Sequence, residues 1–104
     1  MQSILKPGQT INSSLGHEYI IKNFIGSGGQ GEVYQATGKG RDWAVKWYFS
    51  HQATDEQKKI LEKLVADGAP NKNFLWPLEL LSVHSIKGYG YIMPLREKRF
   101  KNIV

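Results

Sequence analysis

Apolar and polar positions alternate along most of this chain in short stretches rich in β-branched and aromatic residues, which is typical of antiparallel strands. Segments that favour turns separate these stretches. Gly38-Lys39-Gly40 is expected to form a tight turn between two strands, and Lys87-Gly88 is expected to lie in another. Five strands are predicted on this basis, over residues 19–25, 32–37, 41–49, 78–84 and 89–93.

One segment shows helical periodicity instead. Thr54 and Gln57 offer a capping box, in which the threonine side chain accepts from the backbone and the glutamine side chain reaches back. Residues 68–71 would end the helix at about Asp67. We therefore predict an α+β fold, a five-stranded antiparallel sheet with one helix inserted after the third strand. The apolar face of this helix is expected to hold Ile60, Leu61, Leu64 and Val65.

Composition narrows the class of protein. At 104 residues the chain is long enough for one small core. Without cysteine it can form neither a disulfide nor a thiolate metal site, and a reducing cytoplasm is the expected location. The longest apolar run, residues 74–81, is interrupted by Pro77 and Glu79 and is too short to span a bilayer. Residues 1–16 lack the pattern of a signal peptide, so no membrane partner is expected.

Charge adds little to this picture. The net charge of +5 comes from 14 basic and 9 acidic residues spread along the chain. Part of the excess suits an anionic ligand, and part lies on the expected solvent face of the helix, so no nucleic-acid partner is expected. One basic cluster stands apart near the C-terminal end, at Arg96, Lys98, Arg99 and Lys101.

The most informative motif is the glycine-rich run Gly26-Ser27-Gly28-Gly29-Gln30-Gly31. Such a spacing occurs in dinucleotide-binding turns and in the phosphate loops of protein kinases. In the first case the last glycine opens a helix, whereas here it is followed by a predicted strand. The glycines are therefore expected at a hairpin tip, where residues without a Cβ can adopt positive φ and bring backbone N–H groups to phosphate oxygens.

Three side chains close to this hairpin fit the same chemistry. Val33 would point onto an adenine ring, and Ala44 on the next strand is small enough to leave room for the base. Lys46 lies two residues after Ala44 and therefore on the same face of the strand, where its ammonium could meet the α- and β-phosphates.

Residues 19–96 resemble the N-terminal lobe of a eukaryotic-type Ser/Thr protein kinase, and the wording of residues 29–34, 74–78 and 90–95 is similar to bacterial members of that family. The resemblance implies ATP as cofactor and a bulky gatekeeper after the fifth strand, at Met93. It also implies that the Pro94 carbonyl and the Arg96 N–H pair with the edge of adenine. Proline lacks only the N–H, which that contact does not use.

The resemblance further implies a glutamate on the helix that forms an ion pair with Lys46. Glu62 is our choice, because it lies near the middle of the helix. The register stays open, since an alignment beginning at Gln57 would place glutamine at this position, and Glu56 is also near. We prefer Glu62 because the capping box already accounts for Gln57.

On the same resemblance, residues 1–18 form a leader, 19–95 the small lobe, and 96–104 the hinge and the start of a connection to a large lobe. The catalytic and metal-binding aspartates of a kinase belong to that large lobe, together with the protein-substrate site and the ligands of Mg-ATP. None of Asp42, Asp55 and Asp67 stands in the required motif. The chain is therefore expected not to catalyse transfer alone.

Two functions remain open: the ATP-binding half of a kinase, and a stand-alone nucleotide-binding or regulatory module. A dinucleotide enzyme is disfavoured by the strand after Gly31. If the apolar face meant for the other lobe is uncovered, self-association is also expected.

Overall fold

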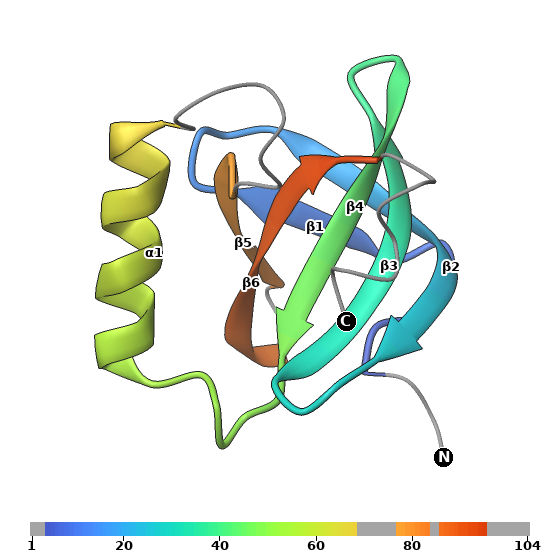
Figure 1. Cartoon of the computed structure of the whole chain (residues 1–104). Coiled ribbons are helices and arrows are strands. Elements are labelled where there is room, and N and C mark those ends of the chain that lie inside the picture. The colour runs from blue at the N-terminus through green and yellow to red at the C-terminus, as the bar shows by residue number, and fades with distance from the viewer. Residues whose placement is uncertain (1–3, 69–76, 84–85, 96–104) are drawn as a thin grey trace.

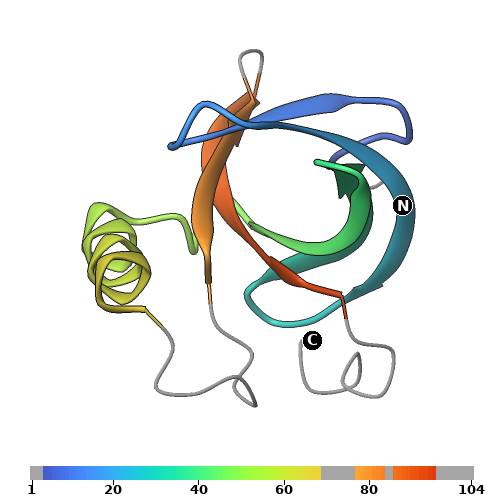
Figure 2. The same ribbon diagram turned by 90° about the horizontal axis from the view of Figure 1, so that it is seen from above.

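Six antiparallel strands and one helix make up the parts that the computed structural model describes, residues 4–68, 77–83 and 86–95 (Figure 1). The strands close into a barrel in the order β1-β2-β3-β4-β6-β5, and Figure 2 shows the helix outside this ring. The elements are β1 (Thr10–Ser13), β2 (Glu18–Ser27), β3 (Gly31–Gly38), β4 (Arg41–Tyr48), α1 (Asp55–Asp67), β5 (Glu79–Val83) and β6 (Ile86–Pro94).

The predicted open sheet of five strands is wrong, because β1 closes the sheet. Ile11 of β1 lies opposite Tyr19 of β2, and Asn12 lies opposite Ser82 of β5. Only four residues long and containing Asn12 and Ser13, β1 carries too little alternation to be recognised as a strand. The segment expected to be a leader thus supplies a strand of the barrel, as well as the fully buried side chains of Leu5 and Ile11.

Large side chains fill the barrel. Tyr19, Tyr34 and Trp47 are all but completely buried inside it, together with aliphatic residues from each strand. Because side chains alternate along a strand, those next to these core residues point outward. The outward residues of β3, β4 and β6 therefore form a second surface, which carries the candidate site.

Turn chemistry explains how the strands meet. Lys39 and Gly40 have φ of 52° and 76°, so the β3–β4 hairpin has the two-residue turn with positive φ that suits twisted strands. The predicted turn at Lys87-Gly88 is wrong, since both residues lie within β6, whose first residue Ile86 pairs with Val83 of β5.

Helix α1 begins and ends where its capping residues predict. The Thr54 hydroxyl accepts from the Gln57 backbone N–H at 3.1 Å, and Gly68, with φ of 77°, donates to the Leu64 carbonyl at 3.1 Å. Its packed face differs from the prediction, because Leu61 is buried while Ile60 is 54% exposed. No helix in the described parts of the chain is long and apolar enough to cross a membrane.

Candidate functional site

Strands β3, β4 and β6 bring four of the predicted site residues onto one outward face. Val33 lies opposite Lys46 across β3 and β4, and Ala44 lies opposite Met93 across β4 and β6. Residues between them in the sequence, such as Val45, point into the barrel core instead. The face therefore combines an apolar group with one ammonium, which is the pairing expected for a ligand with an apolar ring and an anionic end.

The apolar part of this face is covered in the structure. Val33, Ala44 and Met93 are 1%, 0% and 2% exposed, and Ile25 and Leu95 pack against them. Our expectation of an uncovered apolar surface is therefore not met at these three residues, and the argument for self-association through them no longer holds. A ring that binds here would have to take the place of the side chains that cover the cluster.

The glycine-rich segment forms the tip of the β2–β3 hairpin. Gly26 and Ser27 end β2, residues 28–30 form the loop, and the Gly28 N–H donates to the Gly31 carbonyl at 3.0 Å. Positive φ was expected here but is absent from Gly26, Gly28, Gly29 and Gly31, all of which the structure describes.

Gly31 has a different requirement. A Cβ at Gly31 would collide with the backbone carbonyl of Trp47 on β4, whereas one at Gly29 would meet open space. Close pairing of β3 with β4 thus accounts for the glycine at position 31, independently of any ligand.

Lys46 is half-buried between the loop and a tyrosine. Its Nζ donates to Oε1 of Gln30 at 2.8 Å and lies 5.4 Å from the ring centroid of Tyr48. Partial burial lowers the pKa of Lys46 from its usual value, because desolvation disfavours the charged form. Among the described residues no carboxylate lies within 4 Å of this ammonium. Its partners are neutral, so its charge remains available to an anion.

The structure does not bring Glu62 to Lys46. Glu62 is exposed and lines a cavity of about 240 Å³ beside Ser82 of β5, on another side of the helix. Gln57 of the helix instead reaches Tyr48, a neighbour of the lysine, and its Nε2 donates to the Tyr48 hydroxyl at 3.5 Å. Our reason for setting Gln57 aside fails, because its side chain turns to Tyr48 and only its backbone N–H takes part in the cap.

The expected gatekeeper Met93 and the expected hinge residue Pro94 are the last two residues of β6. Met93 is buried and Pro94 lies opposite Trp43, at the end of the β4–β6 pairing. Arg96 lies outside the described residues, as does the rest of the basic cluster that ends at Lys101.

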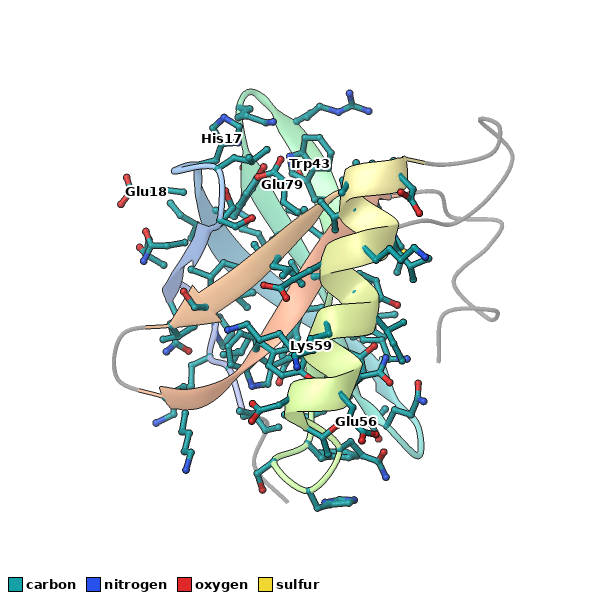
Figure 3. All side chains as sticks on the ribbon, turned by 90° about the vertical axis from the view of Figure 1, so that its left-hand side faces the viewer. His17, Glu18, Trp43, Glu56, Lys59 and Glu79 are labelled. Carbon is teal, nitrogen blue, oxygen red and sulfur yellow. The ribbon has the colours of Figure 1, made fainter. Side chains whose placement is uncertain are left out.

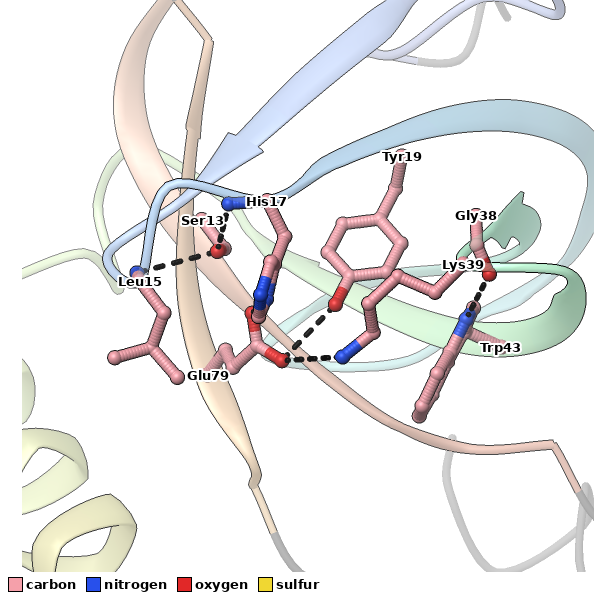
Figure 4. Close-up of polar contacts among 8 residues, drawn as sticks. All are labelled: Ser13, Leu15, His17, Tyr19, Gly38, Lys39, Trp43 and Glu79. Atoms are coloured by element: carbon pink, nitrogen blue, oxygen red, sulfur yellow. Dashed lines mark hydrogen bonds and ion pairs between the residues drawn. The ribbon is translucent and has the colours of Figure 1, made fainter.

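A second polar cluster, at the other end of the barrel, escaped the sequence analysis (Figure 4). The carboxylate of Glu79 at the start of β5 accepts from His17 Nδ1 at 3.0 Å and from the Tyr19 hydroxyl at 2.9 Å, and it pairs with Lys39 at 3.5 Å. In Figure 3 the labelled His17 and Glu79 lie near the end of the barrel opposite to Glu56 at the start of α1. Its members lie far apart in the sequence, so no local pattern signals the cluster.

Burial of Glu79 acts against its ionisation, but other interactions outweigh it. Hydrogen bonds from Ser13, His17 and Tyr19, together with the charge of Lys39, lower the pKa of Glu79 below its usual value. Both oxygens of this carboxylate accept hydrogen bonds from side chains of the same protein, which is typical of a structural role.

Comparison with known proteins does not assign this chain to a family. A search against protein-family models found no match, and a search of curated proteins found none. The described part of the chain contains no group of three or more metal-ligating side chains that could hold a metal ion.

Proposed function

We propose that this chain is an ATP-binding small lobe of a Ser/Thr protein kinase, with its nucleotide site on the outward face of β3, β4 and β6. One observation carries the proposal: Val33, Ala44, Met93 and Lys46 lie together on this face, beside a glycine-rich hairpin tip. The closed barrel departs from the open sheet that the resemblance implies. The proposal therefore rests on the site and on the sequence motifs.

The residues present fit a nucleotide in both its parts. Val33, Ala44 and Met93 supply the apolar surface that an adenine ring needs, and the short Ala44 side chain leaves it room. Lys46 supplies a cation with no carboxylate partner among the described residues, and only the Gln30 amide would have to yield to a phosphate. Lys46 would hold and orient phosphates, and the backbone of residues 26–31 would cover them.

Affinity is expected to be weak. Ile25 and Leu95 occupy the surface of the apolar cluster, so binding of a base includes the free-energy cost of displacing them. The sequence supplies no aspartate in a metal-binding kinase motif, so Mg-ATP would gain no metal ligand from this chain.

Titration with ATP, followed by backbone amide NMR, tests this function. Shifts are expected at Val33, Ala44 and residues 26–31, and Lys46→Ala is expected to weaken binding at least tenfold without unfolding the chain. Lys22→Ala is the matched control, since Lys22 is an exposed lysine on β2. Perturbations centred elsewhere, for instance on Arg99 and Lys101, or equal losses in the two variants, would overturn the assignment.

No carboxylate of the described residues lies beside Lys46, which favours one alternative, a nucleotide-binding or regulatory module without catalysis. An ion pair on this lysine belongs to the active kinase arrangement, and Gln57 cannot neutralise it. The two functions separate in a polypeptide that joins these residues to a large lobe. Phosphorylation that Lys46→Ala abolishes supports the kinase, and ATP binding without any phosphorylation supports the module.

A further inference from the structure

Three tyrosines form a cluster on the outward face, between Lys46 and helix α1. The rings of Tyr48 and Tyr89 have centroids 5.4 Å apart, and those of Tyr48 and Tyr91 are 6.1 Å apart. Tyr48 and Tyr89 are 4% and 8% exposed, and Leu61 of the helix packs with them. Tyr48 thus belongs to the cluster through which the helix contacts the barrel.

The hydroxyl ends of this cluster meet the beginning of α1. The Tyr89 hydroxyl donates to the backbone carbonyl of Thr54, the N-cap residue, at 2.7 Å. The Tyr48 hydroxyl lies 3.5 Å from Nε2 of Gln57, one turn into the helix. Two tyrosines on neighbouring strands therefore hold the first turn of the helix to the barrel.

The ring of Tyr48 also contacts Lys46. Two residues apart on β4, their side chains share one face, and the ammonium lies 5.4 Å from the ring centroid, within the range of a cation–π interaction. Tyr48 thus contacts both the lysine and the helix. The resemblance had instead implied a direct ion pair between Lys46 and a glutamate of the helix.

We propose that Tyr48 is a positioning residue, whose ring holds the Lys46 ammonium beside the glycine loop and whose hydroxyl couples that lysine to the first turn of α1 through Gln57. The role of Lys46 toward phosphate rests on the proposed function, but the contact itself does not. Because the ring is neutral, it orients the ammonium without cancelling its charge. An anion arriving at Lys46 therefore meets an uncompensated cation.

The titration of the Lys46 side chain, measured by NMR on the free chain, tests the ring contact without any nucleotide. In Tyr48→Leu the site keeps an apolar side chain but loses the π face, so the pKa of Lys46 should fall by about half a pH unit. Tyr48→Phe keeps the ring and should leave this pKa unchanged. Tyr89→Phe is the matched control, because it removes the hydrogen bond to the Thr54 carbonyl and keeps the contact between Tyr48 and Lys46.

The helix side of the proposal is tested at two helix positions outside the buried core, the half-buried Gln57 and the exposed Glu62. Gln57→Glu places a carboxylate beside Tyr48 and should raise the pKa of Lys46, whereas Glu62→Gln should leave it unchanged. Tyr48→Phe should shift the side-chain amide signals of Gln57, and Tyr89→Phe should shift them less. If Tyr48→Leu does not fold, the comparison of the Lys46 pKa in Gln57→Glu and in Glu62→Gln decides whether the proposal holds.

An unchanged Lys46 pKa in both Tyr48→Leu and Gln57→Glu would overturn the proposal, and so would an effect of Tyr89→Phe equal to that of Tyr48→Leu. ATP affinity is a separate readout. If no variant or wild type binds ATP but the lysine titrations behave as expected, the proposed function fails while the positioning role of Tyr48 stands.

Discussion

Replacing Glu79 with glutamine should destabilise the barrel more than any change to an exposed glutamate. Glu79 joins three separate parts of the closed sheet: its own strand β5, the β1–β2 turn that carries His17, and the β3–β4 turn that carries Lys39. Its side chain is only 6% exposed. The substitution keeps the shape of the side chain and removes its charge, so the test isolates the electrostatic contribution.

The expected magnitude follows from the individual contacts. The bonds from His17 and Tyr19, at 3.0 and 2.9 Å, have ordinary hydrogen-bond lengths, and each hydrogen bond to a charged group contributes about 1.5–3 kcal/mol. The pair with Lys39 contributes little, because the lysine side chain is 41% exposed. A glutamine oxygen can still accept one of the two bonds, which leaves a loss of about 2–3 kcal/mol. For a domain of this size that corresponds to a fall in Tm of about 10–20 °C.

Urea unfolding followed by tryptophan fluorescence measures this loss, with Glu18→Gln as control because Glu18 is an exposed glutamate at the start of β2. The pKa of Glu79 is lower in the folded chain than its usual value of 4.5, so its stabilisation is present above that pH. It is lost as the pH falls through the folded-state pKa. The difference between wild type and Glu79→Gln should therefore shrink in acid. A loss within about 0.5 kcal/mol of the Glu18→Gln control, or a difference independent of pH, would refute this account.

Two further predictions concern single positions. Gly31→Ala should destabilise the chain by about 2 kcal/mol or more, since the added Cβ meets the Trp47 carbonyl, while Gly29→Ala should change stability by less than about 0.5 kcal/mol because its Cβ meets nothing. Both are read from urea midpoints, and equal effects at the two glycines would contradict the packing argument. Thr54→Ala should cost about 1 kcal/mol by removing the N-cap that holds the Gln57 N–H. Thr54→Ser should recover most of that loss, and a full loss in the serine variant would show that the hydroxyl is not responsible.

Local patterns were sufficient to predict the helix and the approximate positions of five strands. The capping residues Thr54 and Gly68 fix the ends of α1, and alternation marks the long strands β2, β3 and β4. Closure of the barrel could not be predicted, because it depends on the four residues of β1 pairing with the next strand, β2, and with the distant strand β5. Turn-forming residues within so short a strand conceal it.

Only the part of the candidate site that lies on strands was predictable, because side-chain alternation determines which residues share a face. Side-chain alternation is sufficient to place Ala44 and Lys46 on one face, and the strand pairings then add Val33 and Met93. The partner on the helix was not predictable from the sequence. The capping motif predicts the hydrogen bond of the Gln57 backbone N–H. The direction of the Gln57 side chain depends instead on how the helix packs beside Tyr48.

The two polar clusters of the barrel differ in a way that assigns them different roles. At one end the Glu79 carboxylate is buried among donors from its own chain, and replacing such a group affects stability, because each donor would be left without its partner. At the glycine loop, Lys46 is half-buried beside the Gln30 amide and the Tyr48 ring, and burial lowers its pKa with no carboxylate of the described residues to compensate. A protein gains no stability from a cation held in this way, since desolvation disfavours it. An anion would supply the missing charge, which is why we propose Lys46 as the binding residue and assign Glu79 a structural role.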